Sequence, residues 1–120
     1  MKAAYLKAPY MFEVRDVELR EIKDTEVIVD VKACGFCGHD NILASYQAKD
    51  WEPFGHEFSG IVEKVGKLVT NVKVGDRVCV ETATFDPLLD CSRNGRPDFD
   101  NTPCGDSFME LDKGFRTGMG

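Results

Sequence analysis

The stretch TEVIVDVKAC, at residues 25–34, carries the strongest secondary-structure signal of the chain. Valine occupies every second position from Val27 to Val31, and the positions that alternate with the valines include Asp30. A period of two sends successive side chains to opposite faces of a strand. The stretch therefore predicts a β-strand with one face buried and the other in contact with solvent.

Shorter strand patterns lie on both sides of this stretch. They are KAAYLK (residues 2–7), FEVR (12–15), VEL (17–19), an apolar run at 58–65 and another at 78–80. Turn signals that contain glycine and asparagine separate the later runs. Many short strands joined by such turns predict a mainly β fold, either a barrel or a sandwich.

A short helix is predicted directly after the segment CGFCGH (residues 34–39). Asp40 or Asn41 can cap its N-terminus, because a short polar side chain accepts hydrogen bonds from free backbone N–H groups. Its apolar face would comprise Ile42, Leu43 and Tyr46. By contrast, residues 86–120 contain three prolines and five glycines and show no sustained period, so we expect loop there.

The composition indicates a protein that folds in water and argues against two kinds of partner. The 120 residues suit one domain, with 42% hydrophobic and 30% charged residues. The net charge is −6 and no Lys/Arg-rich run is present, so we expect no nucleic-acid partner. No apolar run approaches the roughly 20 residues that cross a bilayer, and the N-terminus does not resemble a secretory signal. We therefore expect no membrane partner and a cytoplasmic location.

Two clusters of ligand-type residues could hold a metal ion. The segment CGFCGHD (residues 34–40) follows the strand predicted at 25–34, and GHE (residues 55–57) precedes the next strand. A thiolate, an imidazole and a carboxylate all bind zinc, and three protein ligands leave a fourth position for water or substrate. Gly55 gives the backbone the freedom to turn sharply before the His-Glu pair. The two clusters predict a catalytic metal site.

Other uses of the cysteines stay open at this point. A Cys-x-x-Cys pair also occurs in structural zinc sites and in redox motifs. A structural zinc ribbon needs a second such pair, which the chain lacks, because Cys79, Cys91 and Cys104 are widely separated. Five cysteines without a secretory signal favour thiol or metal chemistry over a disulfide framework.

Four segments, taken together, match one family of enzymes. They are GHEFSG (residues 55–60), ACGFCGHD (33–40), VGDRV (74–78) and MKAAYLKAP (1–9). The first two resemble the zinc signature and the cysteine-ligand motif of zinc-dependent medium-chain alcohol and polyol dehydrogenases. The last two resemble a recurrent strand and the usual opening of the same family. The resemblance extends from Met1 to about Glu81.

This resemblance implies a fold and a set of site residues. The fold would be a GroES-like distorted β-barrel with one or two short helices, incomplete at its C-terminus. Cys37 and His56 would bind a catalytic zinc, and Glu57 would be a direct ligand, as in the sorbitol dehydrogenase branch, or an exchangeable partner. Asp40 matches the acid that hydrogen-bonds the ligating histidine, although it could instead cap the helix. Cys34 is not a ligand in that pattern.

One departure from the family concerns His39. The family usually carries Ser or Thr at this position, where the hydroxyl passes the proton of the substrate alcohol onward. An imidazole titrates near neutrality, so His39 could take this proton directly and count among the catalytic residues with Cys37, His56 and Glu57. The alternative is an ordinary solvated residue at the start of the helix.

Two further departures concern missing parts. The positions that align with the four structural-zinc cysteines of many relatives are Asp86, Leu89, Ser92 and Asp100. Four thiolates cannot assemble there, and Cys91 with Cys104 could form only an irregular site, so we predict one zinc per chain. No G-x-G-x-x-G follows any strand, so the Rossmann domain that binds NAD(P) in the family is absent from this chain.

We therefore expect residues 1–120 to be the N-terminal part of a GroES-like, zinc-binding catalytic domain. The intact enzyme would oxidise a secondary alcohol or polyol with NAD or NADP, in the sorbitol, butanediol or threonine dehydrogenase branch, and would be a homo-oligomer. The fragment by itself would be inactive. The alternatives are a stand-alone metal-binding or thiol-redox module and a barrel that serves only as an interaction module.

Overall fold

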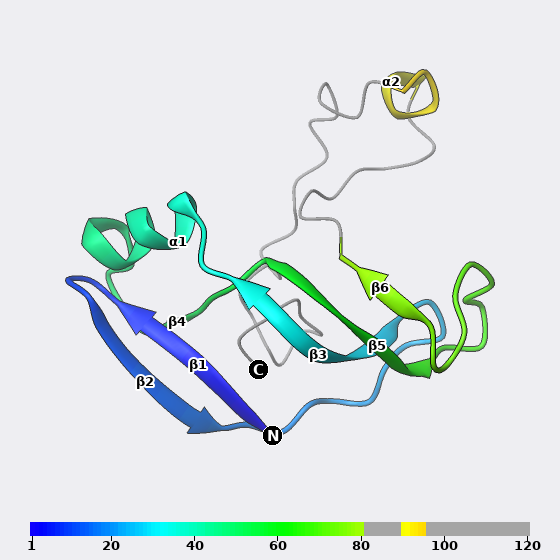
Figure 1. The fold of residues 1–120 in the computed structure, drawn as a ribbon, viewed down its shortest axis with the longest axis horizontal. Helices are drawn as coiled ribbons and strands as arrows, with labels where there is room; N and C mark the ends of the chain where they lie inside the picture. The colour runs from blue at the N-terminus through cyan, green and yellow to red at the C-terminus, as the bar shows by residue number, and fades with distance from the viewer. Residues whose placement is uncertain (81–89, 96–120) are drawn as a thin grey trace.

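The computed structural model describes residues 1–80 and 90–95 (Figure 1). The strands are β1 (Lys2–Lys7), β2 (Met11–Asp16), β3 (Val27–Gly35), β4 (Glu52–Pro53), β5 (Glu57–Val65) and β6 (Arg77–Cys79). The helices are α1 (Gly38–Ile42), the π-helix η1 (Leu43–Gln47) and α2 (Asp90–Arg93). The predicted mainly β fold with short helices is confirmed.

The strands form two antiparallel sheets of three strands each. The first has the order β2-β1-β4 and the second has the order β3-β5-β6. Figure 1 shows the two sheets side by side, with α1 and η1 above the end of the first sheet. The described strands do not close into a complete barrel. The prediction of a short strand at residues 17–19 is wrong. The preceding strand, β2, ends at Asp16, and residues 17–19 form no strand.

The pairing of β3 with β5 brings the two ligand clusters to one place. Cys34 pairs with Phe58 and Gly35 with Glu57, so the end of β3 lies beside the start of β5. Two register irregularities interrupt the ladder, and the backbone of Gly60 lies close to that of Asp30 on the neighbouring strand. A Cβ atom on Gly60 would lie 2.3 Å from the backbone oxygen of Asp30, so only glycine fits there.

Helix α1 begins earlier than the sequence indicates. Its N-cap is Cys37, which adopts an extended backbone conformation. Asp40 lies within the first turn, and its Oδ2 accepts a hydrogen bond from the backbone N–H of Cys37 at 3.0 Å. The prediction of Asp40 or Asn41 as the N-cap is therefore wrong. Asp40 reaches back to the N-cap as the third residue of a capping box does.

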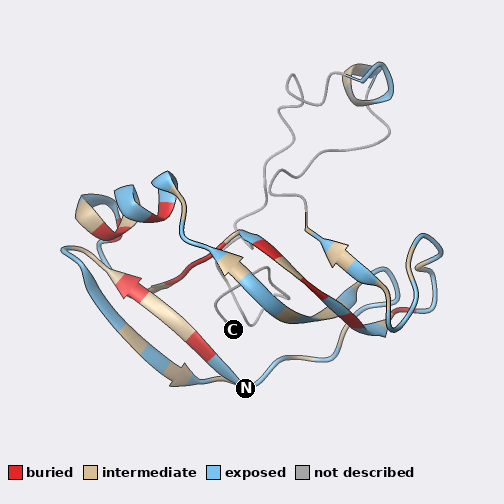
Figure 2. Ribbon diagram, viewed as in Figure 1, coloured by how far each residue is buried: buried red, intermediate tan, exposed pale blue. Residues whose placement is uncertain are grey.

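The helical segment packs on the first sheet through alanines. Ala44 and Ala48 are fully buried and form one core cluster with Leu6 and Phe54. Figure 2 shows in red where buried residues lie along the chain. The predicted apolar face was Ile42, Leu43 and Tyr46. Leu43 does pack against the core, but Ile42 and Tyr46 are 40% and 60% exposed, so that prediction is wrong for two residues of three.

Small side chains explain this orientation, because they let the helical backbone approach the turn between β1 and β2. The backbone N–H of Tyr10 donates to the oxygen of Ala44 at 2.7 Å, and that of Ala8 donates to the oxygen of Ala48 at 2.9 Å. The segment that carries His39 and Asp40 is thus fixed to the first sheet.

The C-terminal part of the sequence is described only at residues 90–95. The loop expected from residue 86 onward is wrong at Asp90–Arg93, which form α2. The rest of that expectation, and Cys104 with it, lies outside the described residues. Within residues 1–80 and 90–95, no helix is long and apolar enough to span a membrane.

Candidate metal centre

The candidate site forms where three segments meet. Cys37 follows the end of β3 and caps α1, Asp40 lies in the first turn of α1, and His56 immediately precedes β5. Gly55 has a φ of 87°, a left-handed conformation that favours glycine. This turn directs the chain from β4 into β5.

Cys37 and His56 face each other at this junction. Their Sγ and Nε2 atoms are 3.1 Å apart, and both residues are half-buried. The two residues are 19 positions apart in the chain. A thiol and an imidazole nitrogen are thus held together by the fold.

Asp40 supports both loops from the buried side. Its side chain is 1% exposed. Oδ2 accepts a hydrogen bond from the N–H of Cys37, and Oδ1 accepts one from the N–H of Gly55 at 3.4 Å. Oδ1 also lies 3.6 Å from Nδ1 of His56. The imidazole of His56 therefore lies between a thiol on one side and a carboxylate on the other.

Three donor atoms in the described part of the chain come close enough to share a metal ion. They belong to Cys37, Asp40 and His56 and lie within 4.8 Å of one another. The sequence placed Asp40 behind the histidine and not on the metal. Asp40 lies beside Nδ1 of His56, and the opposite ring nitrogen faces Cys37. The role of Asp40 behind the histidine stays a prediction.

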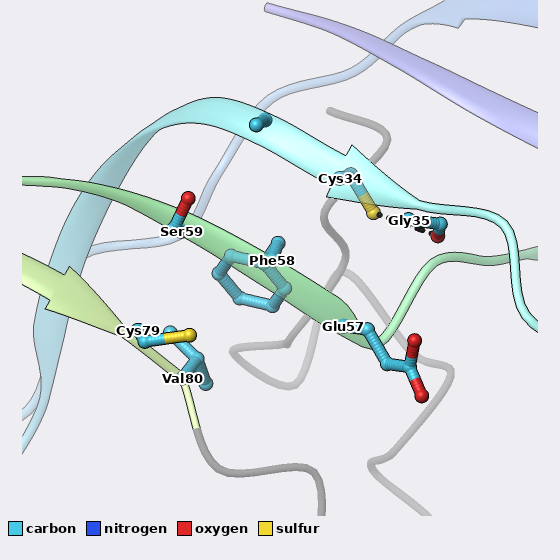
Figure 3. A pocket seen from close by; sticks show the side chains of 8 residues that line it. Cys34, Gly35, Glu57, Phe58, Ser59, Cys79 and Val80 are labelled. Atoms are coloured by element: carbon cyan, nitrogen blue, oxygen red, sulfur yellow. Dashed lines mark hydrogen bonds between the residues drawn. The ribbon is translucent and has the colours of Figure 1, made fainter.

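Glu57 lies apart from these three donors. It is exposed at the start of β5, and its Oε2 is 3.5 Å from where a Cβ on Gly35 would be. It borders a hollow of about 510 Å³ over the ends of β3, β5 and β6, where Figure 3 shows it beside Cys34 and Gly35. The structure does not bring Glu57 to the Cys37–His56 pair, and its place among the ligands stays a prediction.

His39 lies next to the site. It is exposed on α1, and its ring centroid is 5.4 Å from that of His56, with the rings tilted by 57°. A side chain in this position can reach both solvent and a molecule bound near His56. Its predicted role in proton transfer stays a prediction.

Cys34 is not among the three clustered donor atoms to which Cys37 belongs. Partial burial raises the pKa of the Cys34 thiol above its ordinary value, and the negative charges of Asp40 and Glu57 raise it further. The thiolate is the form that binds metals and attacks disulfides. A raised pKa therefore disfavours Cys34 as the reactive thiol of a redox pair.

Comparison with known proteins identifies the family. Residues 23–117 match the family described as the alcohol dehydrogenase GroES-like domain. The chain belongs to this family. The predicted resemblance to zinc-dependent medium-chain dehydrogenases is confirmed, and so is the GroES-like fold.

The relatives of this GroES-like domain are considerably longer proteins. A 119-residue alignment with (R,R)-butanediol dehydrogenase of Saccharomyces cerevisiae is 39% identical and covers 84% of this chain and 30% of the relative. L-threonine 3-dehydrogenase of Bacillus velezensis is 41% identical over 75 residues, or 58% of this chain and 22% of the relative. The chain thus spans less than a third of the length of either protein.

Solved structures support the fold of the GroES-like domain. The structure of galactitol-1-phosphate dehydrogenase from Escherichia coli matches with a TM-score of 0.76. It covers 100% of this chain and 34% of the other, at 24% identity. Benzyl alcohol dehydrogenase from Acinetobacter calcoaceticus matches with a TM-score of 0.72 at 31% identity, over 83% of this chain and 28% of the other.

The donor set of this GroES-like domain fits a zinc ion. With a Zn–S bond of about 2.3 Å and a Zn–N bond of about 2.0–2.1 Å, two tetrahedral ligand atoms lie about 3.6 Å apart. Sγ of Cys37 and Nε2 of His56 are 3.1 Å apart. These two atoms therefore need to move apart by only about 0.5 Å to bind one zinc ion. Zinc-binding histidines usually have a carboxylate or carbonyl near the other ring nitrogen, as His56 has in Asp40.

Sequence reasoning missed one feature beside the site. Phe12, Phe36 and Phe54 form a cluster of three rings in which every pair is in edge contact. The three residues lie in separate segments of the chain, and no periodicity links them. The only sequence signal is the aromatic residue directly before Cys37.

Proposed function

We propose that residues 1–120 supply the zinc-binding part of the catalytic domain of an NAD(P)-dependent alcohol or polyol dehydrogenase. The observation that carries the proposal is the Cys37–His56 pair, with Sγ and Nε2 3.1 Å apart and the buried carboxylate of Asp40 behind the imidazole. Family membership and relatives that act on butanediol, threonine and xylulose support a small hydroxylated substrate. The nicotinamide would be held by a domain outside this chain.

Cys37 and His56 would hold the zinc, with Glu57 as a further ligand or an exchangeable partner. When bound, zinc would polarise the substrate oxygen as a Lewis acid, and NAD(P) would accept the hydride. The carboxylate of Asp40, 3.6 Å from Nδ1 of His56, would orient the imidazole on the metal. The backbone N–H groups of Cys37 and Gly55 donate hydrogen bonds to Asp40, which connects the loops on which both ligands lie.

His39 would exchange the proton of the substrate hydroxyl with solvent. It is exposed and lies beside His56, so a proton taken at the site has a short path to water. General acid–base catalysis of this kind contributes about 10²–10⁴-fold to a rate. Oligomeric assembly and a cytoplasmic location stay predictions.

The test uses a protein in which this chain is followed by a nicotinamide-binding domain. We expect formation of NADH or NADPH that depends on a secondary alcohol or polyol. Cys37→Ser should abolish the activity, and Cys34→Ser, a matched control three residues away, should retain it. His39→Asn should lower kcat by about 10²-fold or more without loss of zinc. Equal activity of the two cysteine variants would contradict the proposal.

A further inference from the structure

The three phenylalanine rings link the two loops that carry Cys37 and His56. The ring centroids are 6.4 Å apart for Phe12 and Phe36, 5.9 Å for Phe12 and Phe54, and 6.0 Å for Phe36 and Phe54. All three pairs are T-shaped, which is a favourable geometry for aromatic side chains. We call these three residues the phenylalanine triad.

The triad is adjacent in sequence to both candidate ligands. Phe36 directly precedes Cys37, and Phe54 is separated from His56 only by Gly55. The contact between Phe36 and Phe54 therefore joins the two loops by an apolar link. The hydrogen bond from the N–H of Gly55 to Asp40 joins the same loops by a polar link.

The three rings differ in how much they contribute to the core. Phe54 is 7% exposed and packs with Leu6 and the two buried alanines. Phe12 and Phe36 are 51% and 49% exposed. About half of each of these two residues therefore stays exposed, although both rings contact the buried Phe54. Their geometry is better suited to holding the loops than to stabilising the fold.

Phe12 provides the fixed end of this arrangement. It lies in β2, which pairs with β1 over its full length. Phe36 and Phe54 lie in connecting segments, between β3 and α1 and between β4 and β5. A ring on a paired strand therefore contacts one ring from each of the two loops.

We propose that Phe36 and Phe12 are positioning residues that set the separation of Cys37 and His56. This inference rests on the proposed function, because it assigns the triad to the affinity of the same metal site. Loss of either exposed ring lets the two loops move relative to each other, so the donor atoms must be reordered when a metal binds. The affinity for metal therefore falls clearly, whereas the thermal midpoint of the metal-free chain changes little.

The experiment compares Phe36→Leu and Phe12→Leu with Tyr46→Leu in the 120-residue chain. Leucine keeps an apolar side chain but removes the ring edge. Tyr46 is a control because it is an aromatic residue, 60% exposed, on η1. Co²⁺ is the probe, since a Cys37 thiolate on Co²⁺ gives a charge-transfer band whose titration yields a Kd. The thermal midpoint of the metal-free chain is measured for each variant.

We expect Phe36→Leu and Phe12→Leu each to weaken Co²⁺ binding by about tenfold, in the range found when supporting contacts of metal ligands are removed. The double variant should weaken binding by less than the product of the single effects, because both act through one cluster. Phe36→Tyr should restore the affinity, since it keeps the ring edge. Tyr46→Leu should leave the Kd unchanged.

Three results would overturn the inference. One is a Kd for both leucine variants equal to that of the unchanged chain. Another is a loss of Co²⁺ affinity in the leucine variants that a lower thermal midpoint fully explains, together with a Phe36→Tyr variant whose affinity does not recover. The third is an unchanged chain that gives no thiolate band with Co²⁺, which would overturn the proposed function as well. The first two results leave the proposed function intact.

Discussion

Replacement of Asp40 by asparagine tests the buried support of the site. The carboxylate is 1% exposed and accepts hydrogen bonds from the N–H groups of Cys37 and Gly55. In Asp40→Asn the amide oxygen can accept one of them, and the amide NH₂ must face the other. A hydrogen bond to a charged group contributes about 1.5–3 kcal/mol, and an unsatisfied buried donor costs a similar amount.

We therefore expect Asp40→Asn to lower the free energy of unfolding of the metal-free chain by about 2 kcal/mol. For a domain of this size that corresponds to a fall of about 8 °C in the thermal midpoint. Zinc affinity should fall by about 10–100-fold, because the imidazole of His56 loses its oriented partner. Differential scanning calorimetry and competition with a zinc chelator measure the two effects.

The matched control is Asp16→Asn, which removes the same charge from a side chain that is 81% exposed and paired with Lys2. This variant should change stability by less than 1 kcal/mol and leave zinc affinity unchanged, because exposed ion pairs contribute little. If Asp40→Asn binds zinc as tightly as the unchanged chain, the assignment of Asp40 to the support of His56 is refuted.

Three further perturbations test the fold. Gly60→Ala should prevent β3–β5 pairing and give a chain without a cooperative thermal transition, because its Cβ would lie 2.3 Å from the Asp30 oxygen. A thermal midpoint within a few degrees of that of the unchanged chain would contradict the register. Leu6→Ala, at a fully buried position, should cost about 2–5 kcal/mol by urea titration. Arg20 makes two hydrogen bonds to Glu26 and lowers the pKa of that carboxyl from 4.5 to about 2, so Glu26→Gln should cost about 1 kcal/mol at neutral pH. Because the folded-state pKa is depressed, this difference should persist above pH 4.5 and vanish as the pH falls through about 2, which thermal melts across this range would show.

The strands could be predicted from the sequence because their signal is local. The period of two at residues 25–34 depends only on neighbouring side chains, and β3 occupies most of that stretch. The pairing of β3 with β5 depends on which strands meet in space. The close contact at Gly60 and the two register irregularities belong to that pairing, and the period of two does not predict them.

The helix and the triad show where local reasoning fails. Cysteine is not among the preferred N-cap residues, so α1 was predicted to begin too late. The buried alanines of this segment pack against Leu6, which is distant in sequence, so no local pattern predicts that contact. The phenylalanine triad likewise combines residues from three segments. Cys37, Asp40 and His56 are predicted as site residues from the motifs that carry them, and the structure adds their mutual distances.

The zinc content of the purified chain tests the central claim most directly. The proposed site predicts one zinc per chain in the unchanged protein and in Cys34→Ser, and none in Cys37→Ser at equal folded fraction. Retention of zinc by Cys37→Ser together with its loss in Cys34→Ser would show that the metal lies elsewhere. That result, or the absence of zinc from all three proteins after refolding with the metal, would contradict the account.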